Sequence, residues 1–128
     1  MSNFLFIKID SEFLKVSFSD ILYIEAVNKY VRIVTKKKVY LISVTMHFIE
    51  NVLPPDLFCR IHRYYIVSLE HMDKFDNDIV FIENKKFPIG KQYKGSLPSK
   101  VTTLQSDNKI NHKTCTIEID ALLNKINS

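Results

Sequence analysis

The chain has 128 residues, of which 46% are hydrophobic and 25% are charged, and its formal net charge is +4. This length and balance are typical of one soluble globular domain with its own core. No apolar run approaches the roughly 20 residues of a membrane-spanning helix, and no signal peptide is visible. The two cysteines and four histidines show neither a disulfide framework nor metal-ligand spacing. We therefore expect reduced thiols in a cytoplasmic protein, with no metal or other cofactor.

Short runs rich in Ile, Val, Phe and Tyr follow one another along the chain, with polar turns between them. Runs of this kind predict β-strands. The expected strands cover residues 4–9, 13–18, 21–27, 30–35, 39–44, 65–69, 79–82 and 87–89. The first two strands should form one hairpin, and the fourth and fifth a second hairpin. We expect Phe4, Phe6 and Phe18 to lie in the core.

One internal segment changes to helical spacing. Its apolar stripe consists of Met46, Ile49, Val52 and Leu53. Thr45 is suited to cap the start of this helix, and two prolines directly after residue 53 should end it. The sequence thus predicts one short helix within a mostly β domain.

The C-terminal part of the chain has a different character. Residues 98–113 are polar and weakly patterned, which predicts a linker. Helical spacing then returns in four apolar residues, Ile119, Leu122, Leu123 and Ile126. It predicts a helix over 116–126 that docks on the domain or on a second copy. We therefore divide the chain into a domain at 1–97 and a linker with a tail at 98–128.

Charge is distributed in blocks. Residues 28–42 carry five cations and no acid, 59–66 carry two arginines and no acid, and 85–98 carry four lysines and no acid. A fold that brought these blocks to one side would concentrate positive potential there. The last block also holds both glycines of the chain, Gly90 and Gly95, which would suit a tight backbone path or the close approach of a ligand.

Three segments combine these features: ILYIEAVNKYVRIVT (21–35), LPPDLFCRIHRYYIVS (53–68) and FPIGKQY (87–93). Their order and spacing resemble the LytTR-type DNA-binding domain of bacterial transcription regulators, the LytR/AlgR family, over about residues 4–97. The resemblance implies a mainly β fold, an elongated arrangement of small antiparallel sheets with one short internal helix. It also implies a sequence-specific transcription regulator that inserts loop residues into the major groove of promoter DNA.

The resemblance also assigns the DNA-binding residues to three loops. They are Asn28, Lys29 and Tyr30 in the first, His62, Arg63 and Tyr64 in the second, and Lys91, Gln92 and Lys94 in the third. Asn and Gln can bond adenine, Arg and Lys can reach guanine, and any cation can neutralise phosphate. Lys91 stands where the family usually has arginine, which replaces a two-pronged donor with a point charge.

Several further expectations concern single residues. Arg60 should pair with a carboxylate such as Glu50 or Glu70, and Cys59 should be buried and inert. His62, with an ordinary pKa near ~6.5, should strengthen DNA binding as the pH falls from about 8 to 6. The tri-lysine turn at 36–38 should be mainly a solvated turn.

The sequence carries no motif of a common enzyme class. No Gly-rich phosphate loop, nucleophile elbow or HExxH motif is present, so we expect no enzyme. The expected partner is double-stranded DNA with direct repeats, on which the chain would form a homodimer if the tail docks on a second copy rather than on its own domain. The alternative is a protein–protein interaction module of the same fold that lacks specific DNA recognition. Familiar family members carry a receiver domain before the DNA-binding domain, so the chain is either a stand-alone regulator or part of a longer one.

Overall fold

The computed structural model describes residues 2–106, and the helix predicted over 116–126 lies outside this range. Most of the described chain is β-structure. The strands are β1 (Phe4–Ile9), β2 (Glu12–Ser17), β3 (Ile21–Val27), β4 (Tyr30–Thr35), β5 (Val39–Ile42), β6 (Phe58–His62), β7 (Tyr65–Ser68), β8 (Lys74–Phe75), β9 (Ile79–Ile82) and β10 (Lys85–Pro88). The helices are α1 (Met46–Val52), α2 (Ser96–Lys100) and two 3-10 turns, η1 (Phe18–Asp20) and η2 (Lys91–Tyr93). None of the helices within residues 2–106 is long and apolar enough to cross a membrane.

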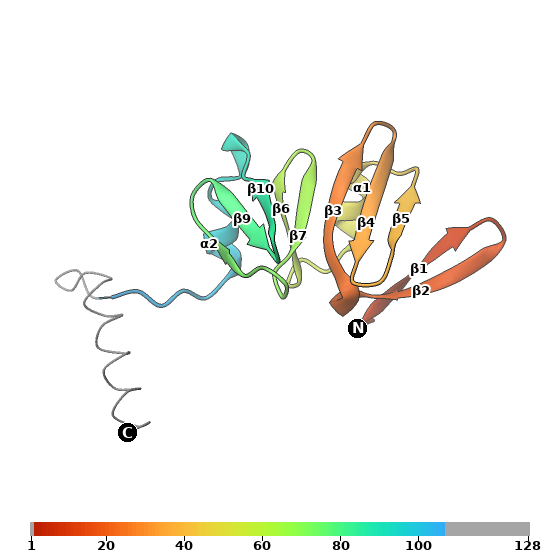
Figure 1. Cartoon of the computed structure of the whole chain (residues 1–128), viewed down its shortest axis with the longest axis horizontal. Helices are drawn as coiled ribbons and strands as arrows, with labels where there is room; N and C mark the ends of the chain where they lie inside the picture. The colour runs from red at the N-terminus through yellow and green to blue at the C-terminus, as the bar shows by residue number, and fades with distance from the viewer. Residues whose placement is uncertain (1, 107–128) are drawn as a thin grey trace, which may run out of the picture.

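The strands form three antiparallel sheets, which lie one beside the next along the molecule (Figure 1). The central sheet has the strand order β5-β4-β3-β7-β6. A three-stranded sheet, β10-β9-β8, lies on one side of it, and the β1–β2 hairpin lies on the other (Figure 1). This arrangement confirms the predicted mainly β fold of small antiparallel sheets with few helices.

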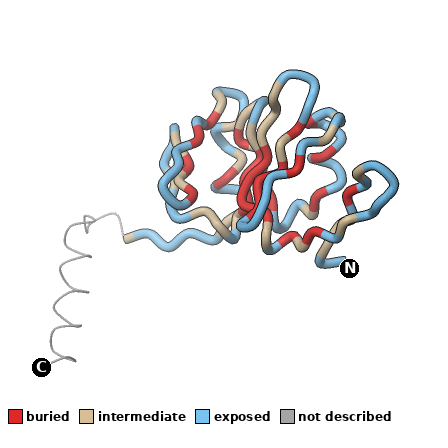
Figure 2. Tube along the Cα trace, turned by 45° about the vertical axis from the view of Figure 1, so that its right-hand side comes forward, coloured by how far each residue is buried: buried red, intermediate tan, exposed pale blue. Residues whose placement is uncertain are grey.

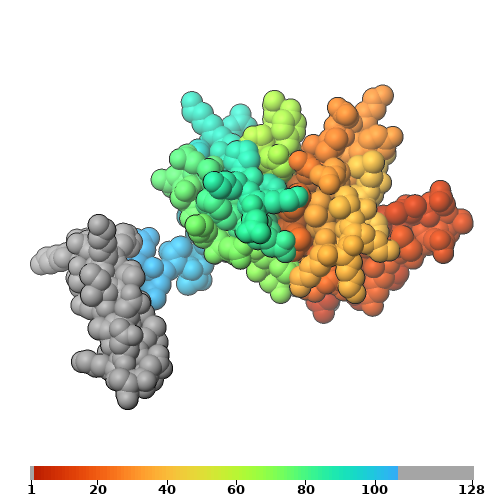
Figure 3. Space-filling view, in the orientation of Figure 1, coloured from red at the N-terminus to blue at the C-terminus, as the bar shows by residue number. Residues whose placement is uncertain are grey.

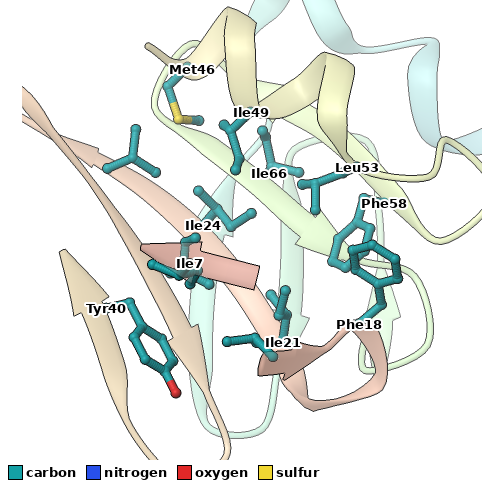
Figure 4. Packing of buried hydrophobic residues seen from close by; sticks show 13 residues of the cluster. Ile7, Phe18, Ile21, Ile24, Tyr40, Met46, Ile49, Leu53, Phe58 and Ile66 are labelled. Atoms are coloured by element: carbon teal, nitrogen blue, oxygen red, sulfur yellow. The ribbon is translucent and has the colours of Figure 1, made fainter. Parts of the chain in front are cut away.

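The central sheet separates two hydrophobic cores, and the buried residues gather along it (Figure 2). On one face, Ile24 and Ile66 pack with α1 and the β1–β2 hairpin (Figure 4). On the other face, Tyr23, Ile61 and Val67 belong to the core that β9, β10 and α2 complete. Strands β3 and β7 are therefore largely buried on both faces, whereas Val39 and Leu41 of the edge strand β5 are about half exposed. The loops at the ends of the buried strands are free to present side chains.

Local signals define α1 as predicted. The Thr45 side chain accepts a hydrogen bond from the backbone N–H of Phe48 at 3.0 Å, and Leu53 is the C-cap before the two prolines. Met46, Ile49 and Leu53 are buried. The assignment of Val52 to the buried stripe was wrong, because Val52 is rotated to the rim of the stripe and is 46% exposed.

The β1–β2 hairpin corrects a second expectation. Phe6 is paired with Lys15 on the outer face of the hairpin and is 55% exposed, so it is not a core residue. Successive side chains of a strand point to opposite faces, and Ile7 takes the inner position. Phe4 is half-buried, with the Lys15 ammonium 4.2 Å from its ring centroid, whereas Phe18 is buried as expected.

Besides the two 3-10 turns, two strands and one helix were not predicted. Residues 58–62 form strand β6, and the two-residue strand β8 pairs with β9. Helix α2 spans residues 96–100, so the predicted start of the linker, at residue 98, falls within this helix. Its Lys100 ammonium donates to the backbone carbonyls of Pro55 at 3.0 Å and Phe58 at 2.9 Å. Leu97 of this helix is buried, whereas residues 98–100 are exposed and only the Lys100 side chain is bonded to the domain. The division of the chain at residue 97 stays a prediction.

Candidate nucleic-acid interface

Three loops meet at one end of the central sheet. Strand β3 runs antiparallel to both β4 and β7, so the β3–β4 and β6–β7 turns leave the sheet at the same end. The Ala26 N–H donates to the Tyr64 carbonyl at 2.9 Å, which joins the two turns. Segment η2 projects beside them (Figure 1), and the space-filling view shows three protrusions along this upper side (Figure 3). We call residues 28–30, 62–64 and 91–92 the three-loop edge.

The first loop is the two-residue connection between β3 and β4. Asn28 has φ 55°, a left-handed conformation that asparagine tolerates better than most residues. Asn28 and Lys29 are exposed, and Tyr30, the first residue of β4, is 46% exposed. The following Val31 is buried and points into the core. The turn therefore presents an amide, an ammonium and a phenol to the solvent.

The second loop is the β6–β7 turn. The Tyr64 N–H donates to His62 Nδ1 at 3.1 Å, so in the neutral ring the proton lies on Nε2, which is left to donate outward. The guanidinium of Arg63 lies over the ring of Tyr64, 4.6 Å from its centroid. Arg63 and Tyr64 are exposed. An arginine held on an aromatic face keeps its five donors available while losing part of its freedom.

The charge environment of His62 differs from that of a free histidine. Burial lowers the pKa of His62 below its ordinary value of 6.5, and the nearby guanidinium groups of Arg63 and Arg60 lower it further. His62 is therefore mostly neutral at pH 7 in the free protein. An anionic group placed against it would favour the protonated ring and raise this pKa.

The third loop lies against the second. The Gly90 N–H donates to the Ile61 carbonyl at 2.7 Å, which brings η2 beside the β6–β7 turn. A Cβ at Gly90 would meet Tyr93 at 3.2 Å and His62 at 3.4 Å, so this close approach favours glycine. At Gly95 a Cβ would meet nothing within 4 Å, so no neighbouring protein group requires glycine there.

Between these two loops lies an open hollow of about 330 Å³. Its walls include the side chains of His62, Arg63, Lys91 and Gln92. Each of these four residues carries a nitrogen donor that can reach a phosphate oxygen or the edge of a base. The fold thus gathers four of the nine predicted DNA-binding residues around one concave surface.

Lys94, the last of the nine, is directed elsewhere. Its ammonium donates to the carboxylate of Asp78 at 2.7 Å and to the Asn77 carbonyl at 2.9 Å. The ion pair is exposed and offsets the charge of Lys94. We therefore do not include Lys94 in the three-loop edge.

The basic blocks of the sequence converge only in part. Lys29, Arg63 and Lys91 lie at the three-loop edge, whereas the tri-lysine turn follows the opposite end of β4. In that turn, the Lys38 N–H donates to the Thr35 hydroxyl at 3.0 Å. Lys85, which belongs to the third basic block, donates to the hydroxyl of Tyr23 at 3.0 Å and is therefore also bonded within the fold.

The expectations for Arg60 and Cys59 are confirmed. Arg60 pairs with Glu50 on α1 at 3.1 Å, one of the two carboxylates named as partners. Cys59 is 1% exposed, and burial raises the pKa of its thiol, which disfavours the reactive thiolate.

Sequence reasoning missed a second surface. An apolar groove runs between the β1–β2 hairpin and α1, and Phe6, Phe48 and Val52 line it while remaining about half exposed. The sequence did contain a signal for this groove. One strand and one helix carry apolar residues on two faces, whereas packing against a single core requires only one apolar face.

Comparison with known proteins identifies this architecture. The family model of the LytTr DNA-binding domain matches residues 11–102, so the chain belongs to the LytTR family of DNA-binding domains. The solved LytTr DNA-binding domain of a Bacillus cereus response regulator has the same fold, with a TM-score of 0.63 at 23% identity. That match covers 73% of this chain and 91% of the other.

Two curated proteins, each called sensory transduction protein LytT, come from Bacillus cereus and Bacillus anthracis. Each is 25% identical to this chain over 91 residues, which is 66% of this chain and 37% of the relative. The chain therefore spans little more than a third of the length of these relatives.

Proposed function

We propose that this chain is the DNA-binding part of a cytoplasmic transcription regulator that reads promoter sequence with the three-loop edge. The observation that carries the proposal is the convergence of three separate chain segments at one end of a rigid sheet. Burial of β3 and β7 on both faces holds the loops in fixed relative positions, and loops on a rigid scaffold are common binding sites. The family to which the chain belongs binds DNA, and LytTR is not a catalytic fold.

The proposed mode of reading is insertion of loop side chains into the major groove. Arg63 is suited to guanine and Gln92 and Asn28 to adenine, since each can make two hydrogen bonds to one base edge. Lys29 and Lys91 are point charges suited to phosphate. Because the three loops are spread along one side of the molecule, we expect the DNA site to extend beyond a single segment of the major groove.

A protein–protein interaction module remains a second candidate, because the groove lined by Phe6, Phe48 and Val52 is an exposed apolar surface. Salt dependence separates the two. If Lys29 and Lys91 contact phosphates, log K should fall with log salt at a slope of roughly 0.9 per contact, about 2 in total. Fluorescence anisotropy with a duplex selected in vitro by the full chain measures the slope. A salt-independent affinity, equal for selected and random duplexes, would reject DNA reading.

The lowered pKa of His62 predicts that the affinity for DNA depends on pH. DNA phosphate near His62 would raise its pKa in the complex above that of the free protein, so the complex binds a proton more readily. Affinity then rises as the pH falls from the higher pKa toward the lower one. Since burial already lowers the free value below 6.5, we expect affinity to keep rising as the pH falls below about 6.5.

His62→Gln tests this directly, because glutamine keeps a donor and cannot titrate. Binding titrations across the pH series should be steeper for the wild type than for the variant. Identical curves would assign the proton uptake to another group.

Assembly on direct repeats as a homodimer is the remaining proposal. Two linked copies gain effective concentration on neighbouring sites. The apolar residues of the tail, Ile119, Leu122, Leu123 and Ile126, supply the proposed contact. A chain ending at Ser106 should lose cooperative binding to a two-repeat duplex, measured by titration, and keep its single-site affinity. Retained cooperativity would show that the tail does not join the copies.

A further inference from the structure

Arg60 contacts two of the three loops, the β6–β7 turn and η2. Its side chain is 16% exposed and leaves strand β6 directly below the β6–β7 turn. The three guanidinium nitrogens have three separate acceptors. Nε donates to the His62 carbonyl at 3.3 Å, one terminal nitrogen to Glu50 Oε1 at 3.1 Å, and the other to the Arg63 carbonyl at 2.9 Å.

The same guanidinium also approaches the third loop. Its central carbon lies 5.8 Å from the ring centroid of Tyr93, the last residue of η2. Tyr93 follows directly on Lys91 and Gln92, and its N–H donates to the Gly90 carbonyl at 2.8 Å. Arg60 therefore touches α1, the β6–β7 turn and η2, three elements far apart in the sequence.

These contacts leave Arg60 poorly placed to bind DNA itself. Each guanidinium nitrogen already donates to a protein oxygen, and the side chain is mostly covered. The carbonyls that it binds belong to His62 and Arg63, whose side chains line the hollow of the three-loop edge. An arginine that is bonded to these two backbone carbonyls restrains the turn from which the side chains of His62 and Arg63 extend.

We propose that Arg60 is a positioning residue that fixes the β6–β7 turn and η2 relative to each other, so that His62, Arg63, Lys91 and Gln92 act on DNA as one unit. This rests on the proposed function. Lysine cannot replace arginine here, since one ammonium cannot span three acceptors and lacks the flat face that lies near Tyr93.

The first test uses the free protein and needs no DNA. Amide hydrogen exchange measured by NMR should be at least about tenfold faster at Tyr64 in Arg60→Lys than in the wild type, because loss of the two carbonyl contacts frees the turn. Exchange at Lys29, in the separate β3–β4 turn, should not change. Glu50→Gln, which weakens only the contact with α1, should have a smaller effect. Unchanged exchange at Tyr64 would overturn the proposal.

The second test is a pair of double-mutant cycles on a selected duplex. Arg60→Lys alone should weaken binding about tenfold, and its effect should shrink when Arg63 is already alanine, since coupled residues are not additive. With Lys29→Ala, on the other loop, the effects should multiply. Equal, multiplicative effects in both cycles would mean a general loss of structure and would contradict positioning.

The two tests separate failure of this inference from failure of the proposed function. If Arg63→Ala and Lys91→Ala leave binding unchanged, the three-loop edge does not read DNA and the proposed function fails. The exchange rate at Tyr64 still decides whether Arg60 fixes the turn.

Discussion

Replacing Ile24 with alanine is expected to lower the free energy of unfolding by about 2–5 kcal/mol. Ile24 is fully buried in the middle of the central strand β3 and packs in the core beneath α1 (Figure 4). Its loss would leave a cavity that the paired strands on both sides cannot close. Urea unfolding followed by circular dichroism measures the change.

Phe6→Ala is the matched control for this prediction. Phenylalanine is larger than isoleucine, but Phe6 is 55% exposed on the outer face of the hairpin, so its replacement should cost less than about 1 kcal/mol. If Phe6→Ala were as damaging as Ile24→Ala, the assignment of inner and outer faces in the β1–β2 hairpin would be wrong.

Arg63→Ala is expected to weaken binding to a selected duplex by about 1–3 kcal/mol and to relax the preference at one base position. Arg63 is exposed at the tip of the β6–β7 turn, where the ring of Tyr64 supports its guanidinium. Parallel titrations against selected and random duplexes measure both affinity and preference. The random duplex should lose less, because it lacks the base contact.

Lys37→Ala provides the control for charge. It removes the same formal charge from the turn at the opposite end of β4, so it should cost little and act alike on all duplexes. Equal, small losses for the two variants would remove Arg63 from the interface.

Local signals allowed much of the fold to be predicted. Thr45 and the prolines after Leu53 define α1 because a cap and a stop act on neighbouring residues. Strand β6 was missed because Arg60 and His62 interrupt its apolar pattern, and its pairing with β7 depends on the whole sheet. Phe6 was misplaced because β1 has apolar residues on both faces, so alternation alone could not choose the inner one.

The composition of the candidate site was harder to predict than the fold. The family resemblance supplied the three segments, but their convergence depends on the order of β4, β3 and β7 in the sheet. Lys94 was included because it is close in sequence to Lys91, whereas its partner Asp78 is brought to it only by folding. Arg60 shows the same limit, since its contacts with Glu50 and Tyr93 join distant elements.

DNA recognition by the three-loop edge is tested most directly by NMR mapping of the full chain during titration with a duplex selected in vitro. The largest amide shift changes should occur at residues 28–30, 62–64 and 91–92, with little change in the tri-lysine turn or in α1. Changes centred on the groove between α1 and the β1–β2 hairpin, or on residues 36–38, would contradict DNA recognition by the three-loop edge.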